Sequence, residues 1–101
     1  MNYQDRFNEL ARRCHYLGLR VKLVPSSVLK DYAGMNYEAA KKIGFPMKKK
    51  EILISRDLSD KARYHTLRHE LIERDLMINK KVKYWPAHVR ALALENPGRI
   101  F

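Results

Sequence analysis

The apolar positions near the amino terminus repeat at intervals of three and four residues. Within 2–16 they are Tyr3, Phe7, Leu10, Ala11 and Cys14. This spacing marks one face of an α-helix, and Gly18 follows where a helix commonly ends. The next segment, 19–24, alternates apolar with basic residues, which is typical of a half-exposed strand. The sequence therefore predicts a helix and then a strand at the start of the chain.

The segment 26–45 has a weaker pattern. Its first half suits a short helix that Gly34 interrupts, and residues 37–43 suit a second short helix that ends at Gly44. A β-prone run follows at 51–55. Because a turn with a capping serine comes next, we expect this strand to lead directly into a helix.

Two helices are predicted in the rest of the chain. Residues 60–78 contain neither glycine nor proline and are rich in leucine, arginine and glutamate, which favour helix. A last helix is expected to begin at Pro86, since proline suits the first helical position, and to end at the Asn-Pro-Gly run at 96–98. The predicted fold is α+β: a small, mainly helical single domain over 1–101, with a short β-sheet packed on the helix 60–78.

Composition narrows the classes of protein to consider. A chain of 101 residues has the length of one domain. Its only cysteine, Cys14, excludes an intramolecular disulfide and a cysteine-cluster zinc site, which favours a cytoplasmic location. No uncharged apolar run reaches the roughly 18 residues of a membrane helix. We therefore expect neither a membrane span nor a signal peptide.

The net charge favours an acidic partner. Lys and Arg number 21 against 11 Asp and Glu, which gives a formal charge of +10. Nucleic acid is one such partner, and Lys48, Lys49 and Lys50 are the candidate phosphate contacts. The same charges also suit a solvated surface, and no glycine-rich phosphate loop, zinc-finger spacing or aromatic RNA-binding signature accompanies them. Nucleic-acid binding without catalysis is therefore kept as an alternative.

Histidine and glutamate are concentrated on the predicted helix 60–78. His69, Glu70 and Glu73 form a His-Glu-x-x-Glu motif, and His65 lies one turn earlier. Residues four apart share a helix face, so His69 and Glu73 can bind one metal ion. Glu70 is rotated by about 100° and would lie beside the metal, where a general base for water belongs. His65 is an alternative ligand, although we rather expect it to hydrogen-bond substrate or solvent.

A zinc site needs about three protein ligands, so one must come from outside the motif helix. His88 is the candidate, because it lies near the start of the next helix after a connection just long enough to turn back. Farther along that helix, Glu95 could orient His88 by accepting a hydrogen bond. Tyr84, one turn before His88, could stabilise an oxyanion. The sequence thus predicts a Zn²⁺ site of two histidines and one glutamate, with a plain charged helix face as the alternative.

The order of strand, loop and motif helix resembles the core of a minimal zincin metallopeptidase, nearest the ImmA/IrrE family. In that family a strand precedes a Thr-Leu-x-His-Glu-Leu-x-His helix. The matching residues here are Thr66, Leu67, His69, Glu70 and Leu71. The chain departs from the family at Glu73, where the second histidine would stand, and at His88, where the acidic ligand would stand. The exchange leaves two histidines and one carboxylate, a set that suits zinc.

The resemblance, which covers 51–95, implies cytoplasmic cleavage of a protein or peptide substrate. It implies that Glu70 activates a zinc-bound water for attack on a peptide carbonyl and returns the proton to the leaving amine. An extended substrate would lie along the exposed edge of the strand 52–54. We therefore predict a zinc-dependent metallopeptidase. The alternatives are a basic nucleic-acid-binding protein without catalytic activity and a zincin-like fold that serves only as an interaction scaffold.

Overall fold

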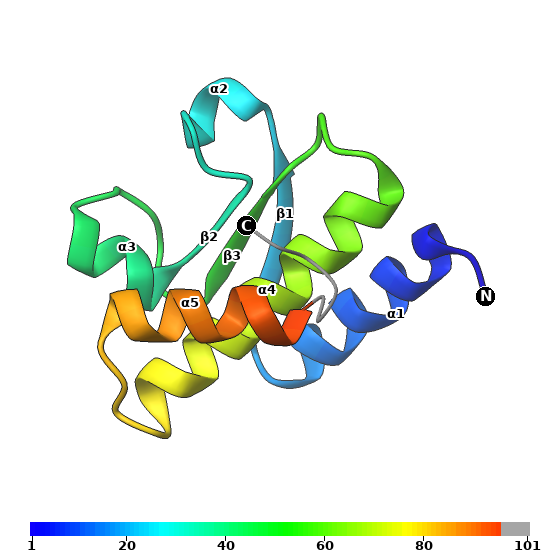
Figure 1. Cartoon of the computed structure of the whole chain (residues 1–101). Coiled ribbons are helices and arrows are strands. Elements are labelled where there is room, and N and C mark those ends of the chain that lie inside the picture. The colour runs from blue at the N-terminus through cyan, green and yellow to red at the C-terminus, as the bar shows by residue number, and fades with distance from the viewer. Residues whose placement is uncertain (96–101) are drawn as a thin grey trace.

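A helix and a strand begin the chain, as the apolar pattern predicts. In the computed structural model, which describes residues 1–95, helix α1 spans Tyr3–Tyr16 and strand β1 spans Arg20–Val24 (Figure 1). The side chain of Asn2 caps α1 by accepting a backbone hydrogen bond. Gly18 has a φ of 80°, in the left-handed region that glycine adopts without strain. It therefore allows the sharp turn from α1 into β1.

The middle of the chain, where the apolar pattern is weak, forms the two predicted short helices. It also forms a strand that the sequence did not predict. Helix α2 spans Ser26–Leu29, strand β2 spans Gly34–Asn36 and helix α3 spans Tyr37–Ile43. Asn36 caps α3 through its side chain, and Gly44 ends this helix in the left-handed conformation. The sequence Gly-Met-Asn has low strand propensity. It becomes a strand because a neighbouring strand pairs with it.

The strands form one sheet in the order β1-β3-β2. Strand β3, Glu51–Ser55, pairs parallel with β1 and antiparallel with β2, and all of its residues are buried. The prediction that the strand 52–54 offers an exposed edge is therefore wrong, because β1 and β2 occupy both of its sides. The free edges of the sheet belong to β1 and β2.

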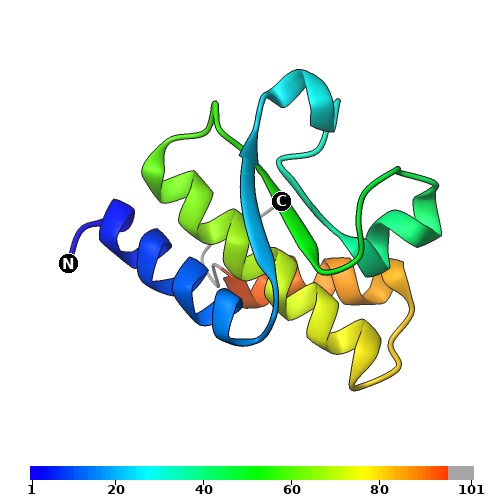
Figure 2. The ribbon, with the colours of Figure 1, turned by 180° about the vertical axis from the view of Figure 1, so that it is seen from behind.

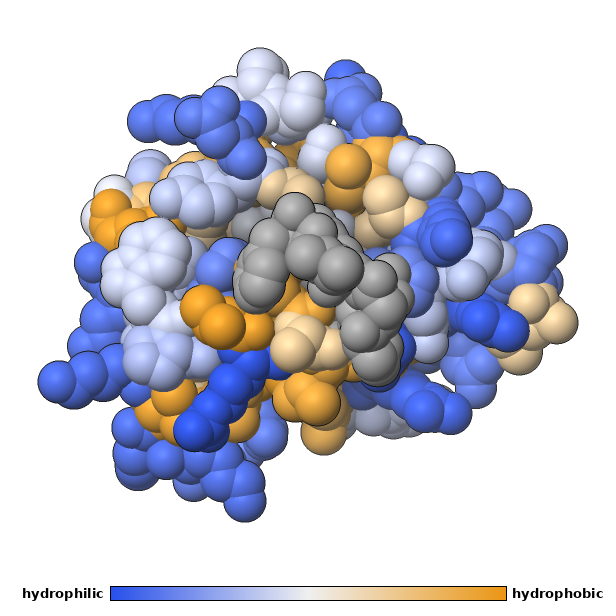
Figure 3. Space-filling model, viewed as in Figure 1, coloured by the Kyte–Doolittle hydropathy of each residue, from blue (hydrophilic) through white to orange (hydrophobic). Residues whose placement is uncertain are grey.

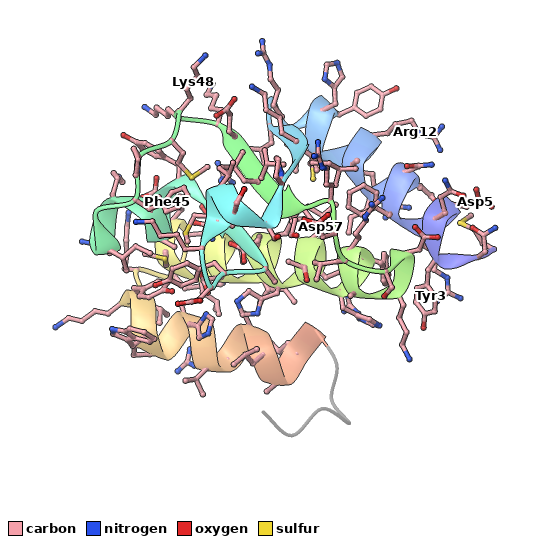
Figure 4. The ribbon with its side chains drawn as sticks, turned by 90° about the horizontal axis from the view of Figure 1, so that it is seen from above. Tyr3, Asp5, Arg12, Phe45, Lys48 and Asp57 are labelled. Carbon is pink, nitrogen blue, oxygen red and sulfur yellow. The ribbon has the colours of Figure 1, made fainter. Side chains whose placement is uncertain are left out.

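Helix α4, Asp60–Ile78, has the predicted bounds and lies between the sheet and helix α5, Tyr84–Glu95 (Figure 4). Helix α1 packs beside α4 (Figure 2). Helix α5 begins two residues before the predicted start at Pro86. The proline lies in the first turn of α5, where its missing N–H removes no intrahelical hydrogen bond. The helix can therefore start earlier without a kink.

Two groups of buried apolar side chains hold these layers together. The first joins α1 and α4 to the sheet and comprises Phe7, Cys14, Leu19, Ile52, Ile54 and Leu67. The second comprises Leu29, Met35, Ala39, Ala40, Leu53 and Tyr84. Alternate residues of a strand point to opposite faces, so Ile52 and Ile54 join the first group and Leu53 the second. The predicted α+β fold is confirmed.

The face that carries α5 is mainly hydrophilic toward its margins and has apolar residues nearer its centre (Figure 3). On this helix Trp85, Val89 and Leu94 are all exposed. None of the helices within the described residues has both the length and the apolar character required to cross a membrane.

Candidate metal centre

Three side chains from α4 and α5 meet at one point, as predicted. His69 Nε2 lies 3.0 Å from Glu73 Oε2 and 3.1 Å from His88 Nδ1. His88 Nδ1 lies 2.8 Å from the same oxygen of Glu73. The ligand atoms of a tetrahedral zinc site with bonds of about 2.0 to 2.2 Å stand about 3.3 to 3.6 Å apart. Small outward movements would therefore let these three atoms hold one ion.

His69 Nε2, Glu73 Oε2 and His88 Nδ1 form a triangle of close contacts. Hydrogen bonds alone cannot make all three contacts favourable while Glu73 is ionised. A carboxylate oxygen only accepts, and each imidazole nitrogen either donates or accepts. If both nitrogens donate to Glu73, their two N–H groups face each other across 3.1 Å. If only one donates, the lone pair of the other faces the lone pair of the carboxylate. A cation among the three atoms makes every one of these contacts favourable, so the donor set fits a metal ion.

Glu73 is in the state that a metal ligand requires. Its side chain is only 2% exposed, and burial alone would raise the pKa of its carboxyl. The hydrogen bonds and charges of His69 and His88 outweigh this effect and hold the pKa of Glu73 below its ordinary value. The carboxylate is therefore ionised at neutral pH, which metal binding needs.

Asn36, which no sequence motif indicates, donates hydrogen bonds to both carboxylates of the motif. Its Nδ2 donates to Glu70 Oε1 at 2.9 Å and to Glu73 Oε1 at 3.1 Å, and its Oδ1 accepts from the backbone N–H of Ala39. The side chain is fully buried. The only signal in the sequence was an asparagine suited to cap the short helix at 37–43. This amide leaves Glu73 Oε2 turned toward the two imidazoles.

Glu70 lies beside the triangle and not in it, as its position on the helix predicts. Its Oε2 lies 3.9 Å from His69 Nε2, and its side chain is buried. Glu70 also lines the cleft onto which His69 and His88 open. A carboxylate in this place can accept a proton from a water molecule next to the metal site.

The cleft has a volume of about 360 Å³ and runs between α5 and the segment that leads into β2. Its walls are formed by Asp31, Tyr32, Ala33, Gly34, Thr66, His69, Glu70, Tyr84, Trp85, His88 and Leu92. None of these described lining residues is a lysine or an arginine. The walls therefore combine apolar and aromatic side chains with a few polar groups, as ligand sites usually do.

Tyr84 lies next to the candidate metal ligand His88, and its role toward an oxyanion stays a prediction. It lines the cleft, and its ring centroid is 5.8 Å from that of His88. Burial raises the pKa of the Tyr84 phenol, and the negative charge of Glu73 raises it further. The phenol therefore keeps its proton and remains a hydrogen-bond donor at neutral pH.

His65 lies outside the group of side chains that could hold a metal ion, so the less favoured reading of it as an alternative ligand finds no support, and its expected hydrogen bond to substrate or solvent stays a prediction. Its ring packs against Tyr64 and against Tyr3 of α1, with centroid distances of 5.3 and 5.7 Å. His65 is not among the described residues that line the cleft. Glu95 ends α5, but its side chain lies outside what the structure describes, so its role toward His88 stays a prediction.

The lysine triplet lies away from the metal ligands. Lys48, Lys49 and Lys50 line a separate cavity of about 290 Å³ together with Gly18, Arg20 and Glu51. In Figure 4, Lys48 lies on the opposite side of the molecule from α5. The lysines and the metal ligands therefore belong to different sites.

The geometry of His69, Glu73 and His88 shows a group of side chains that could hold a metal ion. In comparisons with known proteins, no family model, curated protein or solved structure matches the chain.

Proposed function

We propose that this protein is a zinc-dependent hydrolase of minimal-zincin type that cleaves peptide bonds. The observation that carries the proposal is the convergence of His69 Nε2, Glu73 Oε2 and His88 Nδ1 at 2.8 to 3.1 Å. Two imidazoles and one carboxylate are a ligand set of catalytic zinc sites. The resemblance of 51–95 to the ImmA/IrrE family supports the same activity.

The residues of the cleft take complementary roles in this proposal. Zn²⁺ in the site would supply a Lewis acid that polarises a carbonyl and lowers the pKa of water to about 7. Glu70, held by Asn36, accepts the proton of the attacking water and gives it to the leaving nitrogen. The Tyr84 phenol donates a hydrogen bond to the carbonyl oxygen as negative charge develops there.

The charge of the cleft favours a peptide over a phosphate ester. Enzymes that transfer phosphoryl groups place Arg, Lys or metal ions around the transferring group. Here the described lining residues include no Lys or Arg, whereas Asp31 and Glu70 add negative charge. A single Zn²⁺ would then be the only cation to offset the charge of an anionic phosphodiester beside these carboxylates, whereas an uncharged peptide bond needs no further cation.

The free edge of β2 offers a place for an extended substrate. Ser55 donates its backbone N–H to the carbonyl of Ala33, so Ala33 directs its backbone groups toward β3. Backbone direction alternates along a strand, so the N–H and C=O of Gly34 point away from β3. Gly34 also lines the cleft. A peptide paired with this edge would pass next to the metal ligands.

Elemental analysis tests the metal site. Protein purified without a histidine tag should contain close to one zinc per chain, and His69→Ala and His88→Ala should each lose it. His65→Ala is the matched control, because this histidine lies on the same helix but outside the triangle, and it should keep the metal. Metal-free wild-type protein that also fails to bind added zinc would contradict the proposal.

The Glu70→Gln variant tests the chemistry. It should retain zinc but cleave an unstructured peptide library, read by mass spectrometry, about 100 to 10,000 times more slowly than the wild type. Glu9→Gln is the control, because Glu9 lies on α1 and does not line the cleft, and it should cleave at the wild-type rate. Equal rates for wild type and Glu70→Gln would remove Glu70 as the base.

We propose nucleic-acid binding as a second function, supported by the cavity at the lysine triplet. Arg20 and the three lysines line it, and Glu51, the one carboxylate among its described lining residues, pairs with Lys22 at 2.7 Å. Four basic side chains in this wall are therefore available to phosphates.

Salt dependence tests this second function. Binding of labelled single- and double-stranded DNA should weaken steeply as salt rises, and Lys48→Ala/Lys49→Ala/Lys50→Ala should flatten the slope. The matched control replaces Lys80, Lys81 and Lys83, which removes the same charge and likewise includes one residue with positive φ. Equal slopes for the two triple variants would reject the cavity as the phosphate site.

A further inference from the structure

The chain exposes a tryptophan beside its candidate metal ligands. Trp85 is 64% exposed, and its ring lies 4.8 Å from that of Tyr84 and 6.0 Å from that of His88, measured between centroids. Exposed apolar side chains become informative when they gather at a cleft. Here the exposed ring of Trp85 stands at the entrance to the metal centre.

Two more side chains complete an apolar wall around the metal ligands. Trp85 precedes His88 by three residues on α5 and Leu92 follows it by four, so the two flank His88 by one turn on either side. Tyr32, also partly exposed, lines the cleft from the segment before β2. A substrate side chain that contacts these three residues would bring its own backbone next to His88.

The electrostatics of the cleft contrast with those of the whole chain. The protein carries a formal charge of +10, yet the described residues that line the cleft include Asp31 and Glu70 and no Lys or Arg. Apart from the proposed Zn²⁺, the described lining offers no cation to a carboxylate that lodges against Tyr32, Trp85 and Leu92, so desolvation of a carboxylate at that wall is costly. An apolar side chain meets no such penalty and gains from leaving water.

We infer that the metal cleft selects a peptide segment by one bulky apolar side chain, which lodges against Tyr32, Trp85 and Leu92, and that it rejects an acidic side chain at that position. The volume of about 360 Å³ is at the lower end of ligand sites, so the cleft holds a short segment and not a folded domain. This inference names the substrate class of the proposed hydrolase and rests on that proposed function.

Tryptophan fluorescence measures the binding directly, because Trp85 is the only tryptophan in the chain. The probes are three capped hexapeptides that differ at one central residue, which is Leu, Ala or Glu in an otherwise Gly-Ser sequence. The zinc-loaded Glu70→Gln variant binds them without cleaving them. The Leu peptide should shift the Trp85 emission to the blue and bind at least about 10-fold more tightly than the Ala peptide, and the Glu peptide should bind least.

Matched variants locate the binding surface by calorimetry. Leu92→Ala and Tyr32→Ala should each weaken the Leu peptide about 10-fold and leave the Ala peptide unchanged. Val89→Ala is the control: this residue is on the same helix and 50% exposed but does not line the cleft, so the variant should bind like its parent. Equal binding of the three peptides, no saturable binding of the Leu peptide at millimolar concentration, or equal effects of Leu92→Ala and Val89→Ala would overturn the inference.

The experiment separates this inference from the proposed function. Tyr32, Trp85 and Leu92 are not metal ligands, so selective binding of the Leu peptide without cleavage by the wild type would keep the apolar subsite and remove the hydrolase. If the wild type instead cleaves the Leu, Ala and Glu peptides with equal kcat/KM, the hydrolase stands and the apolar subsite is wrong.

Discussion

At the scale of single residues, the metal ligands could be predicted and the side chain that supports them could not. His69 and Glu73 share a helix face because of their spacing, and a third ligand was needed within reach of a short connection, which His88 supplies. The link from Asn36 to Glu70 and Glu73 spans 34 and 37 residues of chain. It also depends on a strand that no pattern predicts. The hydrogen bonds from Asn36 to Glu70 and Glu73 could be predicted only if the packing of β2 against α4 were already known.

Asn36 should matter for metal affinity beyond its role as a helix cap. Asn36→Ser keeps a side chain that caps α3, but a hydroxyl is too short to donate to both Glu70 and Glu73. Groups that orient metal ligands typically contribute 10- to 100-fold in affinity. We therefore expect Asn36→Ser to bind zinc about 10 to 100 times more weakly, measured by competition with a chromophoric chelator.

The same substitution elsewhere controls for this result. Asn2→Ser changes the cap of α1, a helix that carries none of the three candidate ligands, and should leave zinc affinity unchanged. Circular dichroism should show equal helix content in both variants. An Asn36→Ser protein with wild-type zinc affinity would show that the carboxylates hold their positions without the amide.

At the scale of secondary structure, the long helix was predictable and the short strand was not. Residues 60–78 are an unbroken run of helix-favouring residues after a capping serine, so α4 has the predicted bounds. Strand β2 has only three residues, and pairing with β3 makes them a strand. Because no pattern predicts β2, the sequence places the free edge of the sheet at 52–54. In the structure β2 forms that edge, in the wall of the cleft. The error followed from a tertiary contact that local propensity does not contain.

Gly34 should be required for the packing of β2 on α4. A Cβ at this position would lie 2.7 Å from Thr66 Cγ2 and 3.0 Å from the carbonyl oxygen of Leu53. Because the second contact is with backbone, the strand must shift. We expect Gly34→Ala to lower the free energy of unfolding by about 1 to 3 kcal/mol, the usual range for overpacking, measured by urea denaturation.

A double-mutant cycle identifies the cause of this loss. Thr66→Ser removes the methyl group that the new Cβ would meet, so it should recover part of the stability that Gly34→Ala loses. The remainder should persist, because the carbonyl of Leu53 stays in place. Strictly additive effects would show that the methyl group is not the obstacle.

At the scale of the whole molecule, the net charge follows from the sequence, but the positions of the charged side chains follow from the fold. Arg68 and Arg90 are on the two helices that build the cleft, yet neither lines it. The Arg68 guanidinium lies over the Tyr64 ring, 5.9 Å from its centroid. Among the residues that the structure describes, the cations of these two helices lie outside the cleft, so its described lining has no Lys or Arg although the chain is strongly basic. No count of charges could have predicted this separation.

Zinc should stabilise the whole domain, because its ligands join α4 to α5 and α4 packs on the sheet and α1. A ligand that binds only the folded state at 100 times its Kd adds about 2.7 kcal/mol to the free energy of unfolding. We therefore expect added zinc to raise the Tm of the metal-free wild type by several degrees, measured by calorimetry, and to leave the Tm of His88→Ala unchanged. Protons compete with the metal for imidazole and carboxylate, so the rise in Tm should shrink as the pH falls from 8 to 5. A zinc-induced rise that is equal in His88→Ala, or that is constant across this pH range, would mean that the metal binds elsewhere on the chain.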